Sequence, residues 1–133
     1  MRVEYIVVHC TDSPDDRDVT AEEVHSWHRK RGWAGIGYHK VIKRDGTIDE
    51  GRPEYWEGAH VKGYNHNSLG VCLVGKEFFS YAQMRALEKI ILELAERYPE
   101  AKVVGHRDLD SRKPCPNFDV KEWWRRVYDG VVD

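Results

Sequence analysis

The sequence predicts an α/β fold, with one mixed sheet of five or six strands and helices packed on its faces. Residues 4–10 and 69–75 are short, β-branched and almost continuously apolar, which is typical of strands buried on both faces. Segments with helical periodicity lie between the strand-like segments, and this alternation favours a layered α/β architecture. With 133 residues the chain fits one domain, which we expect to span residues 1–133.

The first half of the chain predicts a strand, a helix and a hairpin, in that order. The strand "EYIVVHC" (4–10) ends at His9 and Cys10. Thr20 and Glu23 form a capping-box pattern that begins a helix, and this helix stops before Gly32. The segment "YHKVIKRDGTIDEG" predicts a hairpin, because "RDG" is a turn sequence between strand-like residues.

The second half begins with a long loop, residues 51–68, followed by the second buried strand. The capping-box pattern "SYAQ" then begins a long amphipathic helix that ends near Pro99. Its apolar positions are Tyr81, Met84, Leu87, Ile91, Leu94 and Tyr98. Residues 101–106 predict a strand that delivers His106, and Asp119 caps a final short helix.

Charge and composition exclude several classes of protein. The net charge is −2, with acidic and basic residues mixed along the chain, which argues against a nucleic-acid-binding protein. The longest apolar runs are only a few residues, so we expect no membrane insertion, and the N-terminus lacks the features of a signal peptide. The 3 cysteines are widely spaced, which argues against a disulfide framework.

Two histidines and one cysteine are the candidate metal ligands. His9 and His106 each end a buried-type strand, and ligand sites in α/β sheets gather at the carboxyl ends of strands. The loop that follows His106 brings Cys115 back to the same region. Cys115 stands between two prolines that restrict its backbone. Two imidazoles and a thiolate suit zinc and leave a fourth position open, as catalytic zinc sites do. From these residues alone, a satisfied core histidine and a small buried cysteine remain the alternative.

Five segments spread between residues 4 and 124 together resemble the type-2 N-acetylmuramoyl-L-alanine amidases, in particular the short phage lysozymes of that family. The segments are "VHC", "WHRKRGW", "GYHKVIKRDGTIDEGR", "GAHVKGYNHNSLGVCLVG" and "KPCPNFDVKEWW". The resemblance implies the fold that these amidases share with peptidoglycan recognition proteins. It also implies one Zn²⁺ per chain and hydrolysis of the amide between N-acetylmuramic acid and L-alanine of peptidoglycan.

The same resemblance implies roles for individual residues. By position, His9, His106 and Cys115 match the family's zinc ligands. Tyr38 matches its catalytic tyrosine and Lys113 its catalytic lysine, in a loop about one residue longer than in the phage relatives. An ammonium and a phenol hydroxyl are suited to stabilising the oxyanion of amide hydrolysis. Without the resemblance, a packing tyrosine and a solvated surface lysine are the simpler interpretations.

The long loop carries the candidate substrate-binding residues. His60 matches a family position near the cleft, and we expect it to contact substrate. Asn65 and Asn67 either hydrogen-bond sugar or peptide amides or shape the turn. Cys10 faces the other way along its strand from His9, so we expect it to pack in the core. Structural or solvated roles are expected for His25, His28, His39 and His66.

Two other functions stay open from the sequence. One is a non-catalytic peptidoglycan-binding module, although such relatives typically lose the zinc-binding cysteine, which is present here. The other is an amidase that also binds and inhibits a phage RNA polymerase, which nothing in the sequence tests. We expect a monomeric phage endolysin of the host cytoplasm, which reaches peptidoglycan after a separate protein permeabilises the membrane.

Overall fold

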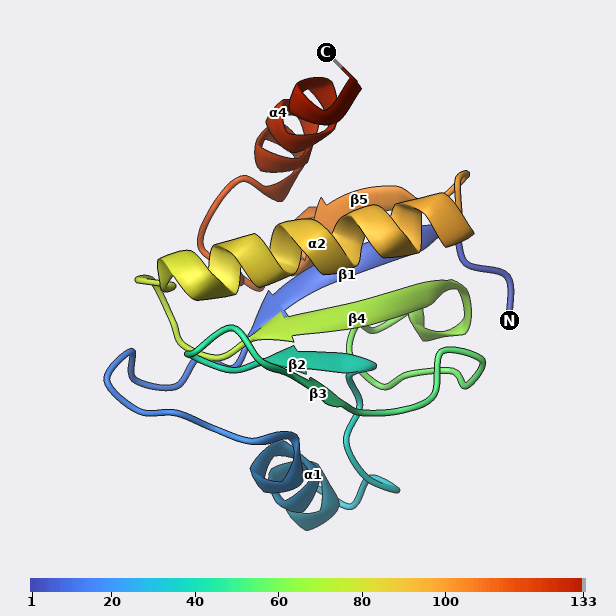
Figure 1. The fold of residues 1–133 in the computed structure, drawn as a ribbon. Coiled ribbons are helices and arrows are strands. Elements are labelled where there is room, and N and C mark those ends of the chain that lie inside the picture. Colours follow the sequence, from blue (N-terminus) through green and yellow to red (C-terminus); the bar gives the residue numbers. More distant parts are fainter. Residues whose placement is uncertain (133) are drawn as a thin grey trace.

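Five strands form one mixed sheet in the computed structural model, which describes the backbone of residues 1–132 and the side chains of residues 1–130 (Figure 1). In chain order the strands are β1 (Tyr5–Cys10), β2 (Lys40–Ile42), β3 (Ile48–Glu50), β4 (Ser68–Leu73) and β5 (Lys102–Gly105). Their order across the sheet is β3-β2-β4-β1-β5, and β3 alone runs antiparallel to its neighbour. The predicted α/β class and mixed sheet are therefore confirmed. The last residue of the predicted 1–133 domain lies outside the described part.

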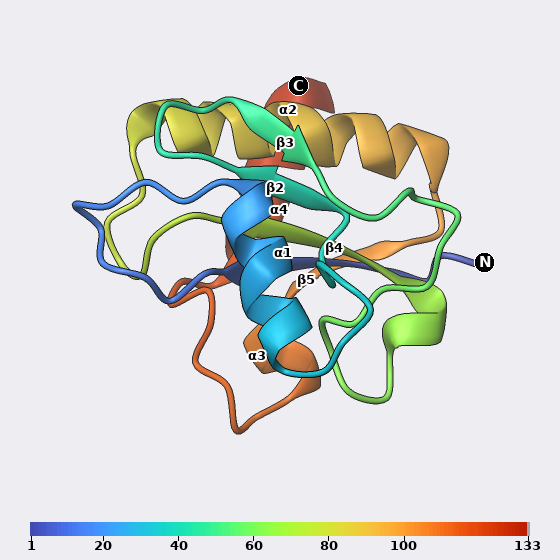
Figure 2. The same ribbon diagram turned by 90° about the horizontal axis from the view of Figure 1, so that it is seen from below.

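Helices cover both faces of this sheet. They are α1 (Ala21–Lys30), α2 (Tyr81–Arg97), α3 (His106–Leu109) and α4 (Val120–Val132), with a 3₁₀ turn, η1 (Asn65–Asn67), in the long loop. Figures 1 and 2 show α2 lying along one face and α1 on the opposite face. The final helix was predicted to be short, and this was wrong, because α4 has 13 residues. Among residues 1–132, no helix has the length and apolar character needed to cross a membrane.

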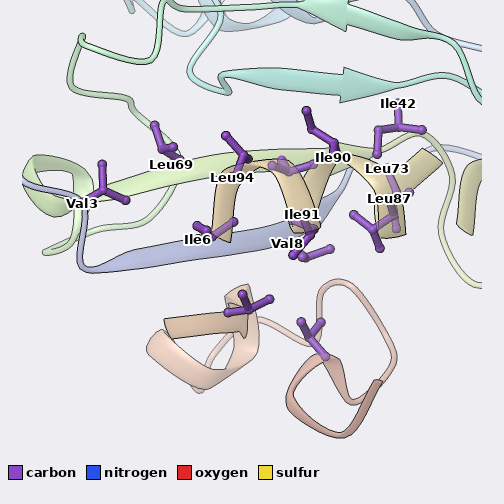
Figure 3. Close-up of a cluster of buried hydrophobic side chains, with 13 residues drawn as sticks. Val3, Ile6, Val8, Ile42, Leu69, Leu73, Leu87, Ile90, Ile91 and Leu94 are labelled. Atoms are coloured by element: carbon purple, nitrogen blue, oxygen red, sulfur yellow. The ribbon is translucent and has the colours of Figure 1, made fainter. Parts of the chain in front are cut away.

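The larger apolar core lies between α2 and the sheet. Leu87, Ile91 and Leu94 of α2 are almost completely buried and pack against side chains of β1 and β4 (Figure 3). Burying each such side chain contributes roughly 1.5–3 kcal/mol of transfer free energy. Val120 at the start of α4 joins the same cluster, so α4 also belongs to this side of the sheet.

Local capping signals set where α2 begins. Ser80 Oγ accepts a hydrogen bond from the Gln83 N–H at 3.0 Å, and Gln83 Oε1 accepts one from the Ser80 N–H at 3.0 Å. This is the predicted capping box. Tyr81 was predicted on the apolar face and is instead 80% exposed. It is the first residue of α2, one turn before the helix reaches the core.

The alternation of side chains along each strand decides which residues lie on the face of the sheet opposite α2. Val8 belongs to the core under α2, whereas Val7 belongs to a smaller cluster with Val61 and Val104 on the α1 side. Because successive side chains of a strand point to opposite faces, His9 points to the same side as Val7. That side, at the carboxyl end of β1, carries the candidate site.

Candidate active site

The two candidate histidine ligands are neighbours because β1 and β5 are parallel and adjacent. Val8 pairs with Gly105 across the two strands, so the residues that follow, His9 and His106, emerge side by side. Their ring centroids are 4.4 Å apart. His106 is also the first residue of α3, which directly follows β5. The register of two strands thus brings together residues 97 positions apart in the sequence.

The thiol of Cys115 completes the group. The Arg107 N–H donates to the Cys115 carbonyl oxygen at 3.0 Å, which ties the loop to α3. The Cys10 N–H donates to Cys115 Sγ at 2.8 Å. His9, His106 and Cys115 each offer one ligand atom, and these three atoms lie within 4.8 Å of one another. The structure therefore brings all three predicted ligands to one point, and we call them the ligand trio.

The protonation of the trio suits a metal ion. Burial, followed by the neighbouring His60 and His106, lowers the pKa of His9 well below its usual value. Burial also lowers the pKa of His106, so both imidazoles are neutral, as metal ligands must be. The adjacent Cys10 side chain and burial raise the pKa of the Cys115 thiol, so a thiolate here needs a cation beside it. Two imidazole nitrogens and one thiolate are a donor set of zinc, and the residues present fit that ion.

A cavity of about 670 Å³ opens beside the trio, and His106 and Cys115 line it. This volume lies within the range of small-molecule sites, roughly 300–1,000 Å³. Its wall also contains Tyr38 and Lys113, so the structure brings together the trio and both predicted catalytic side chains. A ligand in this cavity can reach two members of the trio, a phenol and an ammonium at once.

Tyr38 and Lys113 differ in their surroundings. Tyr38 is half-buried, and its ring centroid lies 5.1 Å from that of His9. Burial, followed by nearby cysteines, raises the pKa of Tyr38, so its hydroxyl stays protonated at neutral pH and can donate a hydrogen bond. Lys113 is exposed at the cavity wall, two residues before Cys115. It can bring positive charge to a bound substrate.

Comparisons with known proteins agree with this geometry. A family model described as N-acetylmuramoyl-L-alanine amidase matches residues 1–118, which is most of the chain. The chain belongs to the N-acetylmuramoyl-L-alanine amidase family. The predicted family and enzyme class are thereby confirmed.

Individual relatives of this amidase include phage and animal proteins. The endolysin of Enterobacteria phage T3 is 42% identical over 131 residues, covering 92% of this chain and 86% of the relative. Among solved structures, the N-acetylmuramoyl-L-alanine amidase LysC from Clostridium intestinale superimposes with a TM-score of 0.86 at 29% identity, covering 98% of this chain and 86% of that one. Drosophila PGRP-LB superimposes with a TM-score of 0.77 at 28% identity, covering 86% and 75%. The predicted amidase and peptidoglycan-recognition fold is confirmed.

The predicted substrate-binding residues of the amidase have three different placements. His60 is buried, lines the cavity and is hydrogen-bonded to His9, with 2.8 Å between His60 Nδ1 and His9 Nε2. Burial lowers the pKa of His60 to about 3, so its ring is neutral. Asn65 lines the cavity, but its Oδ1 accepts hydrogen bonds from the N–H groups of His60 and Val61 at 2.8 and 2.9 Å. Asn65 therefore shapes the loop.

Asn67 lies away from the cavity. Its side chain is buried, and its Nδ2 donates to Glu4 Oε2 at 2.7 Å, beside the start of β1. It is not among the residues that line the cavity. Of the two roles that the sequence left open, this placement supports shaping the chain and gives no contact with a ligand in the cavity.

Two residues of the cavity wall were assigned elsewhere by sequence reasoning. Cys10 was expected to pack in the core. It is buried, but it also lines the cavity next to Cys115. The reason is that β1 ends at Cys10, so the rule that successive side chains of a strand point to opposite faces no longer holds there. His28 lines the cavity, and its Nδ1 accepts a hydrogen bond from the Gly37 N–H at 2.8 Å. His28 lies four residues after Val24, and this spacing places both on the buried side of α1. The burial of His28 could therefore have been predicted from the sequence.

His28 is expected to make the stability of the amidase sensitive to acid. Burial, followed by the charges of Arg31 and Arg52, lowers the pKa of His28 to about 4, against about 6.5 in the unfolded chain. Between pH 4 and pH 6.5 the unfolded state therefore binds more protons than the folded state. The stability that the neutral His28 ring contributes is fully present above pH 6.5 and is lost as the pH falls to 4. The loss is at most about 3 kcal/mol.

Urea unfolding of the metal-free protein at pH 7 and pH 4.5 measures this effect. His28→Asn keeps an acceptor for the Gly37 N–H but removes the titrating group, so its free energy of unfolding should fall less between the two pH values. His66→Asn, at an exposed histidine, is the control and should behave like the parent protein. Equal losses in all three proteins would rule out His28 as a source of the acid sensitivity.

Proposed function

We propose that this amidase is a zinc-dependent endolysin that hydrolyses the amide bond between N-acetylmuramic acid and L-alanine of peptidoglycan. The observation that carries the proposal is the ligand trio, whose three donor atoms lie within 4.8 Å of one another, and two of whose members, His106 and Cys115, line one cavity with Tyr38 and Lys113. The complete trio favours an enzyme over a binding module, because a module that only binds has no need of an open metal site. The phage relative described as an endolysin supports the biological role.

His9, His106 and Cys115 would hold the zinc ion. When bound, zinc supplies Lewis acidity, which activates water near neutral pH and polarises a carbonyl group. The protein supplies the remaining electrostatics. The Lys113 ammonium stabilises the negative charge that develops on the carbonyl oxygen, and the protonated Tyr38 hydroxyl donates a hydrogen bond to the same centre.

The proposal extends to the organisation of the protein in the cell. We place residues 1–133 in one catalytic domain that acts as a monomer. The domain works on the peptidoglycan of the host after a separate protein has permeabilised the membrane. Its substrate is the muramyl peptide, and the cavity of about 670 Å³ has room for the lactyl group and the first residues of the stem peptide.

Mass spectrometry of digested peptidoglycan tests the proposed reaction. We expect stem peptides with a free L-alanine N-terminus and glycan chains without new reducing ends. A parallel digest with the Cys115→Ala variant controls for contaminating lytic enzymes. New reducing sugar ends in the parent digest, absent from the control, would show a glycosidase and reject the proposal.

A further inference from the structure

The imidazole of His60 is part of a chain of hydrogen bonds that leads from the ligand trio into the protein. His9 Nε2 lies 2.8 Å from His60 Nδ1, and His60 Nε2 lies 3.2 Å from Ser68 Oγ. Ser68 Oγ lies 2.6 Å from the backbone carbonyl oxygen of Tyr64. His9, His60 and Ser68 are only 1%, 8% and 0% exposed, so water has little access to these groups.

The carbonyl oxygen of Tyr64, at the end of this series of hydrogen bonds, fixes the direction of each bond in it. A carbonyl oxygen can only accept, so the Ser68 hydroxyl must donate its single hydrogen to Tyr64. Ser68 Oγ then accepts from His60 Nε2, which therefore carries a hydrogen. In a neutral imidazole the other nitrogen is an acceptor, so His60 Nδ1 accepts from His9 Nε2–H. The free lone pair of His9 is consequently on Nδ1.

The surrounding chain packs closely against the His60 ring. A Cβ atom added at Gly58 would lie 2.6 Å from His60 Cδ2, and one added at Gly70 would lie 2.7 Å from His60 Cγ. Both glycines thus make the space that the ring fills. Asn65 Oδ1 holds the backbone N–H of His60 at 2.8 Å, which fixes where the side chain begins.

We infer that His60 and Ser68 are positioning residues, which hold His9 in the one tautomer and orientation that turns Nδ1 toward the metal. The inference rests on the proposed zinc site. His60 was expected to contact substrate, and both of its ring nitrogens already have protein partners, so neither is free to hydrogen-bond a substrate. Partners of this kind, one step removed from the metal, commonly change metal affinity by about 10- to 100-fold.

Zinc affinity, measured by competition with a chromophoric chelator at fixed neutral pH, tests the inference. His60→Leu removes the acceptor for His9 Nε2–H, and zinc should bind roughly 10- to 100-fold more weakly. His60→Asn places an amide oxygen near the Nδ1 position and should recover most of the affinity. Ser68→Ala removes the group that fixes the His60 tautomer and should weaken binding by a smaller factor. His66→Leu, at an exposed histidine of the same loop, is the control and should bind zinc like the parent.

Cobalt substitution adds a readout that does not depend on catalysis. The visible absorption of Co²⁺ reports the geometry of its ligands, so its bands should shift in His60→Leu and stay near those of the parent in His60→Asn. If His60→Leu does not fold, Ser68→Ala and His60→Asn carry the comparison, with circular dichroism as the check on folding.

The possible results separate this inference from the proposed function. Parent-like zinc affinity in His60→Leu or, where that variant does not fold, in Ser68→Ala overturns the positioning role. A raised KM with unchanged zinc affinity would instead assign His60 to substrate binding, which also overturns it. If the parent protein itself binds no zinc, the proposed zinc site fails and the positioning role fails with it.

Discussion

The Cys115→Ala variant is expected to lose amide hydrolysis by roughly 1,000-fold or more, because a Lewis-acid metal contributes several kcal/mol and each 1.36 kcal/mol is a factor of ten. Cys115 supplies the one sulfur of the trio, and its thiolate is the strongest attraction that the site offers to zinc. Removing it leaves two neutral imidazoles, which hold the ion too weakly to keep it. Turnover of muropeptides and the zinc content of the purified variant measure the two effects together.

Chelation tests the same prediction without a substitution. Excess chelator should abolish hydrolysis by the parent protein, and added zinc should restore it. Cys72→Ala is the matched control for metal content, because Cys72 is a fully buried cysteine outside the trio and its replacement should leave one zinc per chain. Full activity of the parent in excess chelator would contradict the metal mechanism.

Lys113→Ala is expected to lower kcat/KM by about 100- to 1,000-fold, the usual cost of removing one group that stabilises the oxyanion. Tyr38→Phe, which removes only a hydroxyl group, should lower it by a similar factor. Neither side chain belongs to the trio, so zinc affinity should not fall in either variant. This separates them from Cys115→Ala, where activity and metal are lost together.

Steady-state kinetics on a soluble muramyl peptide, with zinc content determined in parallel, measures these effects. Lys89→Ala is the control for Lys113, because it removes an exposed lysine of α2, on the sheet face opposite the cavity. It should hydrolyse the substrate at the parent rate. Normal turnover in Lys113→Ala or in Tyr38→Phe would remove that residue from the proposed catalytic set.

Local signals predicted most of the secondary structure because they depend on neighbours in the sequence. The Ser80–Gln83 capping box and the continuous apolar run of β1 appear in the structure as expected. The exposure of Tyr81 and the length of α4 were not predicted correctly. Both depend on how the helix packs in the tertiary structure, which local sequence signals do not specify.

The ligand trio is an intermediate case. The residue types and the family resemblance indicated His9, His106 and Cys115 as ligands. The positions of the two histidines at strand ends indicated that the site lies at the carboxyl ends of the strands. Their approach to within 4.8 Å depends on β1 and β5 being adjacent and on the pairing of Val8 with Gly105. Strand order is a long-range property, so the sequence indicated the ligands and the fold brought them into contact.

The sequence by itself determined the fold class, the amidase family and the residue types of the metal site. Only the tertiary structure decided what the polar residues of the long loop do. Asn67 turns toward Glu4, 63 positions away, and His60 joins His9 and Ser68 through its two ring nitrogens. The physical reason is that an irregular loop has no period to orient its side chains. For His60 and Asn67, these directions depend on hydrogen-bond partners as remote in the sequence as His9 and Glu4.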